Sequence, residues 1–177
     1  MSGGPSDRGS DAPVESRLRR YRPGYGPAVR AVHERALRDA GTAPADVPGN
    51  EDLRHIESAY LESGGEFLVV DLGTAADPEV VATGGFKPAA EGDTSGDGVT
   101  TVELFRMAVA PEHQGEGHGG RVLSGLEHRA SERGFERVVL STAVRQDSAG
   151  FYAAHGYRET GRERYGEYEL IDFEKRL

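Results

Sequence analysis

The sequence predicts a single α/β domain whose mixed, mostly antiparallel sheet carries helices on both faces. The first observation is size: 177 residues, 36% of them hydrophobic, supply enough apolar material for one core. The second is the order of the segments, whose strand-like and helix-like periodicity follows the pattern βααβββαβαββ. The third is a short, nearly all-apolar stretch at residues 137–142, typical of a strand covered on both faces.

The chain begins with a segment that has almost nothing to bury. Residues 1–13 consist mainly of Gly, Pro, Ser and Asp, so we expect a disordered tail there and the folded domain at residues 14–177. Residues 14–21 alternate weakly between polar and apolar and predict the first strand.

Two helices are expected next. Residues 28–40 repeat apolar residues at helical spacing and end before a glycine; these apolar residues are Val29, Val32, Ala36 and Leu37. Asn50 suits the N-cap of a second helix that ends at Gly64. One side of that helix carries Leu53, Ile56, Tyr60 and Leu61.

The middle of the chain predicts a hairpin followed by a long strand. Residues 66–72 and 80–86 are rich in β-branched and aromatic residues, and an Asp-Pro turn lies between them. Residues 99–109 form the longest strand candidate, which a proline ends.

The last third alternates again between helix and strand. A helix is expected at residues 117–133, because apolar residues line one side and a glycine follows. The remaining elements are the buried strand at 137–142, a short helix at 147–155, and two final strands near 157–162 and 168–174.

Composition excludes several classes of protein. No apolar run approaches the roughly 18–20 residues that cross a bilayer, and no apolar segment of a secretory signal follows the first residues. The chain has no cysteine, which excludes disulfides, thiolate metal sites and a cysteine nucleophile. We therefore expect a cytoplasmic protein.

The charge balance argues against polyanionic partners. The net charge is −9 and the pI is about 5.2, so neither nucleic acid nor a membrane surface is an expected partner. Lys87 and Lys175 are the only lysines among 21 Lys and Arg residues. A salt-rich cytoplasm and a GC-rich genome both explain this composition.

A glycine-rich loop follows the long strand and opens the helix at 117–133. Its glycines let main-chain N–H groups turn toward an anion, and the helix behind them adds unpaired donors and a partial positive charge. We expect it to hold a diphosphate, with Arg121 pairing with a phosphate. The loop comprises Gln114, Gly115, Glu116, Gly117, His118, Gly119 and Gly120.

The spacing in this loop distinguishes between phosphate motifs. Gly115, Gly117 and Gly120 have the spacing of the dinucleotide fingerprint GxGxxG, but they do not belong to a first βαβ unit of the chain, and the Walker lysine is missing. The pattern that matches is Q-x-x-G-x-G, from Gln114 to Gly119, directly after a strand. His113 and His118 flank the loop without the HExxH arrangement, so we expect solvated loop histidines and no metal. Residues 93–98 resemble the start of a calcium loop but lack its glutamate, which predicts a solvated hairpin loop.

Three segments in order resemble the GNAT superfamily of acetyl-CoA-dependent N-acetyltransferases. The strand ELFRMAV at residues 103–109 is similar to the family's fourth strand, and the loop from Gln114 to Gly119 is similar to its CoA-diphosphate motif. The segment FYAAHGY at residues 151–157 resembles its later helix-to-strand signature. The resemblance is specific from Glu103 to Tyr157.

This resemblance implies an enzyme that uses acetyl-CoA as cosubstrate and an amine as acceptor, without a covalent intermediate. It implies that Tyr152 protonates the leaving thiolate and that main-chain groups of Met107 and Val109 bind pantetheine at a bulge in the fourth strand. It also implies a V-shaped gap between the fourth and fifth strands. Tyr152 as a core residue with its hydroxyl bonded to backbone is the alternative.

The base is open between two interpretations. With strand alternation, Glu103, Phe105, Met107 and Val109 share one face, so Glu103 either takes the proton of the amine or is a solvated carboxylate. Arg145 stands where many relatives carry an asparagine that touches the cofactor.

The acceptor side has no transferable motif. Substrate contacts are expected from residues 28–64 and from the final hairpin, and the acceptor is either a small molecule or a protein amine. Residues 28–64 hold carboxylates that favour a cationic amine: Glu34, Asp39, Glu51, Asp52 and Glu57. Strand edges in this family often pair, so a homodimer is a further expectation. The alternatives are a non-catalytic acyl-CoA-binding sensor or subunit and an unrelated nucleotide-binding protein.

Overall fold

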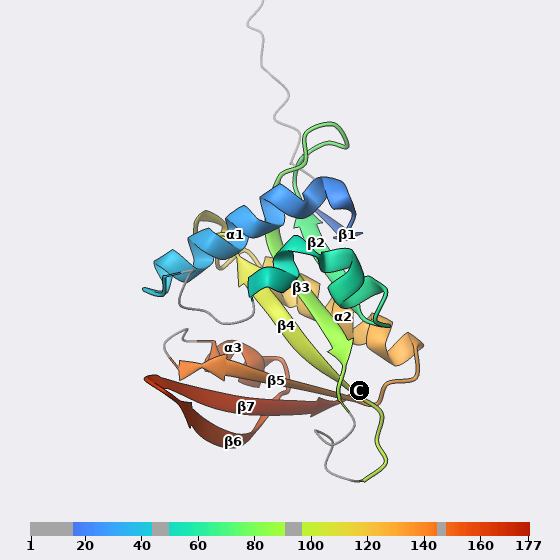
Figure 1. Ribbon diagram of the computed structural model, residues 1–177, viewed down its shortest axis with the longest axis vertical. Helices are drawn as coiled ribbons and strands as arrows, with labels where there is room; N and C mark the ends of the chain where they lie inside the picture. The colour runs from blue at the N-terminus through green and yellow to red at the C-terminus, as the bar shows by residue number, and fades with distance from the viewer. Residues whose placement is uncertain (1–15, 44–49, 91–96, 145–147) are drawn as a thin grey trace, which may run out of the picture.

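The computed structural model describes residues 16–43, 50–90, 97–144 and 148–177, and the expected tail lies outside them. Seven strands form one sheet in the order β1-β2-β3-β4-β5-β7-β6 (Figure 1). Neighbours pair antiparallel except β4 and β5, which are parallel. The strands are β1 (Arg17–Arg20), β2 (Glu66–Asp71), β3 (Val80–Pro88), β4 (Thr101–Val109), β5 (Arg137–Ala143), β6 (Arg158–Tyr165) and β7 (Tyr168–Arg176). The predicted α/β class with a mixed, mostly antiparallel sheet is confirmed.

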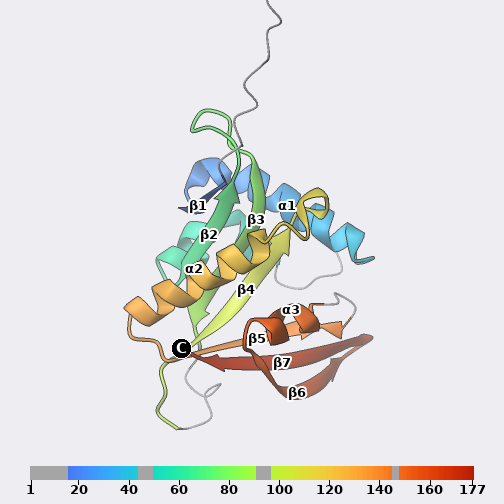
Figure 2. The ribbon, with the colours of Figure 1, turned by 180° about the vertical axis from the view of Figure 1, so that it is seen from behind.

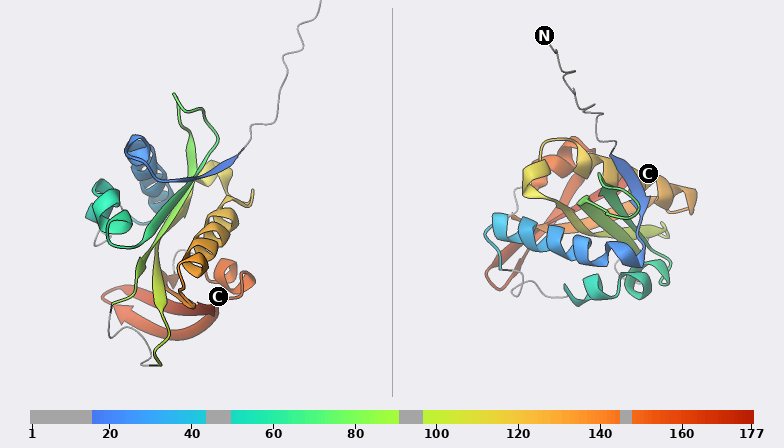
Figure 3. Two further views of the ribbon diagram at one scale, coloured as in Figure 1. Left: turned by 90° about the vertical axis from the view of Figure 1, so that its right-hand side faces the viewer. Right: turned by 90° about the horizontal axis from the view of Figure 1, so that it is seen from above.

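Helices cover both faces of this sheet. The α1 helix (Gly26–Asp39) lies on one face, and α2 (His118–Glu132) and α3 (Ala149–Ala154) lie on the other, as Figures 2 and 3 show from behind and from the side. Short helical turns complete the elements: η1 (Pro23–Tyr25), η3 (Asn50–Arg54), η4 (Glu57–Leu61) and η5 (Pro111–His113). No helix in the described ranges has the length and apolar character needed to span a membrane.

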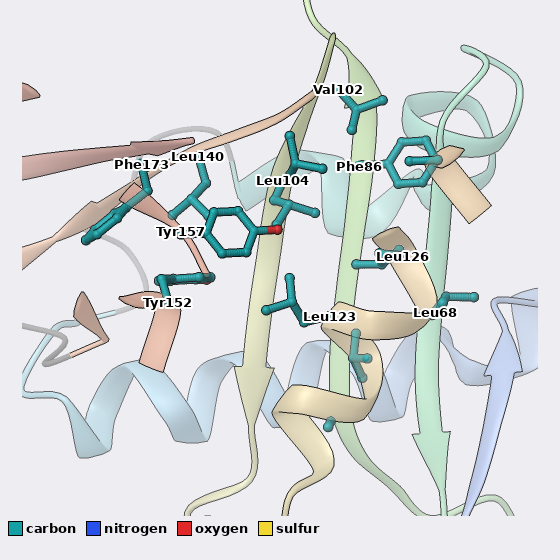
Figure 4. Packing of buried hydrophobic residues seen from close by; sticks show 14 of the residues in the cluster. Leu68, Phe86, Val102, Leu104, Leu123, Leu126, Leu140, Tyr152, Tyr157 and Phe173 are labelled. Atoms are coloured by element: carbon teal, nitrogen blue, oxygen red, sulfur yellow. The ribbon is translucent and has the colours of Figure 1, made fainter. Parts of the chain in front are cut away.

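The core is divided between the two faces. One cluster packs the sheet against α2 and α3, and Figure 4 shows its members Leu104, Leu123 and Tyr152. The other cluster packs the sheet against α1, η3 and η4 through residues such as Val29 and Tyr60. The apolar side chains of β4 are divided between these two clusters.

The second predicted helix differs from the structure. Residues 50–61 form a tight 3₁₀ turn (η3) and a wide π turn (η4) instead of one α-helix. Leu53, Ile56 and Tyr60 are buried as predicted, but the Tyr60 hydroxyl also donates to Asp52 Oδ2 at 2.6 Å. The change of winding lets the two side chains meet, whereas an unbroken α-helix would separate residues eight apart by about 12 Å along its axis.

A bulge interrupts β4 at Arg106, whose φ of 57° is left-handed. Pairing with β3 moves from Phe105 opposite Gly85 to Ala108 opposite Thr83, so Arg106 and Met107 both lie opposite Gly84. A Cβ on Gly84 would come within 2.3 Å of Met107 Sδ, which explains why glycine occupies this position.

Because of this bulge, one prediction about the faces of β4 is wrong. Phe105 and Ala108 pack on the α1 side, whereas Met107 and Val109 pack on the α2 side. The expected common face of Glu103, Phe105, Met107 and Val109 is therefore wrong, because one extra residue shifts the two-residue period.

The parallel pairing of β4 and β5 is short. It joins Thr101–Glu103 to Arg137–Val139 and then stops, and Figure 1 shows the two strands diverging from there. Beyond Glu103, β4 continues beside β3, while β5 continues beside β7. The separation expected between the fourth and fifth strands is present.

Candidate active site

The loop between η5 and α2 takes a shape that glycine makes available. Gly115 has φ of 80° and Gly117, the residue before α2, has φ of 87°. L-residues with a Cβ rarely adopt this region. A Cβ at either position would meet no atom within 4 Å, so the loop borders open space. We call residues 114–119 the phosphate loop.

Three main-chain donors of the phosphate loop have no partner among the described residues. Among the described residues, the N–H groups of Gly115, Glu116 and Gly117 donate no hydrogen bond. The first turn of α2 adds further unpaired N–H groups at the positive end of the helix dipole, and no side chain caps this end. The loop thus has the donors that bind an anion.

Two of the four glycines have a packing role instead. A Cβ on Gly119 would lie 3.3 Å from Val109 Cγ2 and 3.4 Å from Phe151 Cε2. A Cβ on Gly120 would lie 2.8 Å from His155 Nε2. Glycine at these positions lets α2 approach α3 and β4 closely.

The structure also shows the surroundings of Arg121, Gln114 and His155 near the phosphate loop. Arg121 is exposed and donates to the carbonyl of Ser16 at 2.7 Å and to its hydroxyl, while Gln114 is exposed. His155 Nδ1 lies 2.7 Å from the Phe151 carbonyl at the end of α3. Arg145 lies outside the described residues.

The two loop histidines are not both solvated as predicted. His118 is buried, with its Nε2 3.0 Å from Glu116 Oε2, and His113 Nδ1 lies 3.1 Å from the same oxygen. These two hydrogen bonds lower the pKa of Glu116 below its ordinary value. The glycines at 115 and 117 turn the chain back so that Glu116 reaches both rings.

Tyr152 lies on α3 within the core on the α2 face. Its ring is edge-on to Tyr157 at 5.6 Å and lies 5.9 Å from Phe173, and Figure 4 shows these rings together. Burial raises the pKa of its phenol well above the ordinary value, so the hydroxyl stays protonated at neutral pH. Within the described ranges this hydroxyl makes no hydrogen bond, and in particular none to backbone.

Behind the bulge lies a polar cluster that sequence patterns did not reveal. The Arg106 carbonyl accepts a hydrogen bond from Thr83 Oγ1 at 2.9 Å, and His33 Nε2 lies 3.0 Å from it. The Arg106 side chain donates to Asn50 Oδ1 at 2.8 Å and to Asp52 at 3.1 Å. We call these five residues the bulge cluster.

His33 is the buried titratable group of the bulge cluster. Burial, together with the nearby Arg106 charge, lowers the pKa of His33 from 6.5 to about 4. The ring is therefore neutral near pH 7 and serves as a hydrogen-bonding group on α1. The apolar spacing of α1 predicted the helix, but no local signal distinguished His33 from an exposed histidine.

Asp52 is occupied by groups of the protein itself. It accepts from Arg106 and Tyr60, and Lys87 Nζ lies 3.8 Å away, above the rings of Tyr60 and Phe105. Both Asp52 oxygens therefore lie close to cations of the protein, and Oδ1 is a buried atom without a hydrogen bond among the described residues. The expected attraction of Asp52 for a cationic acceptor stays a prediction. Glu34, of the same predicted set, pairs with Arg38.

Two other carboxylates named from the sequence, Glu103 and Asp97, lie near basic residues of the protein. Glu103 is half-buried on the α1 side and lies opposite Lys87 in the β3–β4 pairing. Of residues 93–98, only Asp97 and Gly98 are described, and Asp97 forms a two-pronged ion pair with Arg137 at 2.9 and 3.1 Å.

Known proteins match this chain in sequence and in structure. The family model of the acetyltransferase (GNAT) family matches residues 31–157. An N-acetyltransferase family 8 member 2 from Rattus norvegicus is 31% identical over 62% of this chain and 46% of its own length. An N-acetyltransferase 8B from Homo sapiens is 30% identical over 68% of this chain and 51% of its own length. The chain spans about half the length of the curated relatives it matches.

Solved structures share the fold at lower identity. An acetyltransferase of the GNAT family from Staphylococcus aureus Mu50 superposes with a TM-score of 0.75 at 19% identity, covering 92% of this chain and 99% of that one. An aminoglycoside 6'-N-acetyltransferase complexed with coenzyme A gives 0.66 at 16% identity, covering 90% and 96%.

Proposed function

Because the chain belongs to the acetyltransferase (GNAT) family, we propose that it transfers an acetyl group from acetyl-CoA to a primary amine in a ternary complex. The observation that carries this proposal is the end of β4–β5 pairing at Glu103 and Val139, next to the bulge at Arg106. Past that point no strand of the described chain pairs with the β5 side of β4, which leaves this edge near Met107 accessible to a ligand.

The residues present fit acetyl-CoA. The phosphate loop offers unpaired N–H groups, and a Cβ at Gly115 or Gly117 would point into open space. The phosphate loop would hold the diphosphate, and main-chain groups of Met107 and Val109, whose side chains pack on the α2 side of the sheet, would bind pantetheine. Arg121 has guanidinium donors beyond the one bonded to Ser16 for a phosphate.

Acid and base lie on opposite faces of the sheet. When bound, acetyl-CoA supplies the acetyl thioester. Tyr152 Oη, protonated and on the α2 face, donates its proton to the leaving sulfur. A positioned acid of this kind contributes about 10²–10⁴ in rate.

The amine approaches from the other face. A free alkylammonium has a pKa near 10, so a base has to take its proton before attack. Glu103 is on the α1 side, across β4 from Tyr152, and accepts that proton directly or through water. Cosubstrate and acceptor then meet from opposite sides of the point where β4 and β5 diverge.

Two measurements test this function. Acetyl-CoA at about 100 times its Kd should stabilise the protein by about 2.7 kcal/mol, whereas ATP and NAD should leave its melting temperature unchanged. A panel of small-molecule and protein amines, assayed by release of free CoA, should identify the acceptor. An equal response to ATP would contradict the proposal and favour a general nucleotide-binding protein.

The same panel separates the enzyme from a non-catalytic acyl-CoA sensor. A sensor binds acetyl-CoA but releases CoA with none of the amines. Size measurement in solution and cell fractionation check two further proposals, a homodimer and a cytoplasmic location.

A further inference from the structure

We propose that His113, Glu116 and His118 form a binding site for a divalent transition-metal ion such as Zn²⁺ at the edge of the phosphate loop. Within the described ranges, these three side chains place His113 Nδ1, Glu116 Oε2 and His118 Nε2 within 4.8 Å of one another. The proposal departs from the expectation of a metal-free protein, because the fold brings together histidines that the sequence separates with glycines.

The distances are close to those of a metal site. Zn²⁺ binds histidine nitrogen at about 2.0–2.1 Å and carboxylate oxygen at about 2.0–2.2 Å, which places tetrahedral neighbours about 3.3 Å apart. Glu116 Oε2 already lies 3.1 Å from the His113 nitrogen and 3.0 Å from the His118 nitrogen. The two ring nitrogens lie within 4.8 Å of each other, and His113, with a side chain 22% exposed, is the less buried of the two rings.

The backbone holds the three ligands in place. His113 ends η5, and His118 begins α2 with a side chain that is 10% exposed. Glu116 stands between Gly115 and Gly117, whose positive φ angles curl the loop so that one carboxylate oxygen faces both rings. Little conformational entropy is then lost when a metal binds.

The donor set suits a first-row divalent ion. Two imidazole nitrogens and one carboxylate oxygen are the ligands of Zn²⁺ sites that keep an open position, and imidazole favours Zn²⁺, Ni²⁺ and Co²⁺ over Mg²⁺ or Ca²⁺. The nearby Glu112 is already paired with Arg35. The open position is therefore left to water or to a phosphate oxygen at the loop.

Metal uptake can be measured without acetyl-CoA. Tag-free, chelator-treated protein is titrated with Zn²⁺ by calorimetry and with Co²⁺ by visible absorption. We expect one ion per chain and an affinity that falls by more than about tenfold in each of His113→Ala, Glu116→Gln and His118→Ala. Glu116→Gln is the key variant, because it keeps the shape of an exposed side chain and leaves the fold intact.

A matched control is available on α2. His128 Nε2 lies 3.4 Å from Glu132 in an exposed pair with no third ligand, so His128→Ala should bind the metal like wild type. No uptake, undiminished affinity in Glu116→Gln, or an equal loss in His128→Ala would overturn the proposal. Acetyl-CoA binding measured in chelator tests the proposed function separately, so the failure of one is distinguishable from the failure of the other.

Discussion

The phosphate loop and the bulge cluster lie on opposite sides of β4 and are built in opposite ways. The loop takes all its groups from residues 114–119 and offers main-chain N–H groups that have no partner in the described structure. The bulge cluster joins α1, η3, β3 and β4 through hydrogen bonds between residues 23 to 73 positions apart. We propose that the loop receives a ligand, whereas the hydrogen bonds of the cluster hold the bulge of β4 in shape.

The two regions also differ in how they accommodate a backbone with positive φ. Gly115 and Gly117 adopt positive φ at little cost because they lack a Cβ. Arg106 adopts φ of 57° with a full side chain, a conformation that costs about 1–3 kcal/mol and persists only when its surroundings enforce it. His33 and Thr83 on its carbonyl, with Asn50 and Asp52 on its guanidinium, supply that enforcement.

The largest expected effect comes from Gly117→Val. A β-branched residue is strained at φ of 87° and places methyl groups in the proposed diphosphate position, so acetyl-CoA binding should be lost while the fold persists. Calorimetric titration with acetyl-CoA measures it. Gly134→Val is the matched control, since Gly134 has φ of 85°, open surroundings and a place at the far end of α2. Similar destabilisation with intact binding is expected there; retained affinity in Gly117→Val would argue against the loop as the binding site.

Tyr152→Phe should lower kcat by well over tenfold with little change in acetyl-CoA affinity. It removes a protonated hydroxyl that has no partner in the described structure and leaves the ring packed. Steady-state rates with the best amine, together with a separate acetyl-CoA titration, measure the two quantities. Tyr157→Phe serves as the control, because its hydroxyl donates to Glu127 at 2.9 Å and its loss should reduce stability by about 1 kcal/mol without a comparable loss of rate. An unchanged kcat would remove Tyr152 from the mechanism.

We expect a group in the bulge cluster, and not in the phosphate loop, to make the free energy of unfolding depend on pH. The pKa of His33 is about 4 in the folded protein and about 6.5 when unfolded, so between these values the unfolded chain binds the extra proton. The free energy of unfolding should therefore fall as the pH is lowered from about 6.5 toward 4, by up to about 3 kcal/mol.

Denaturant titrations across this pH range compare wild type with His33→Gln. The variant should lose most of this slope, whereas His128→Gln, which changes an exposed ring, should keep it. Equal slopes in wild type and His33→Gln would show that His33 is not the group responsible. A loss of acetyl-CoA affinity in His33→Gln as large as in Gly117→Val would mean that the two regions do not act separately.

The sequence predicted the structural features that depend only on residues close together in the chain. Periodicity located the seven strands and the helices α1, α2 and α3 within a few residues. Glycine spacing predicted the turn at Gly115 and Gly117, because a backbone with positive φ favours glycine whatever surrounds it. Phosphate binding at this turn stays a prediction. The packing role of Gly119 and Gly120 was missed, because it depends on Phe151 and His155 some thirty residues away.

Tertiary structure alone decided the face of each β4 residue, the winding of residues 50–61 and the partners of His33 and Asp52. An inserted bulge residue shifts every later side chain of the strand to the other face of the sheet. Nothing in the amino-acid sequence of β4 identifies Arg106 as that residue. Asp52 has the sequence context of a helix start, yet its conformation follows from Arg106, fifty-four positions later. Local chemistry fixes which backbone shapes are allowed, whereas the partners of a buried polar group are set only when distant segments pack together.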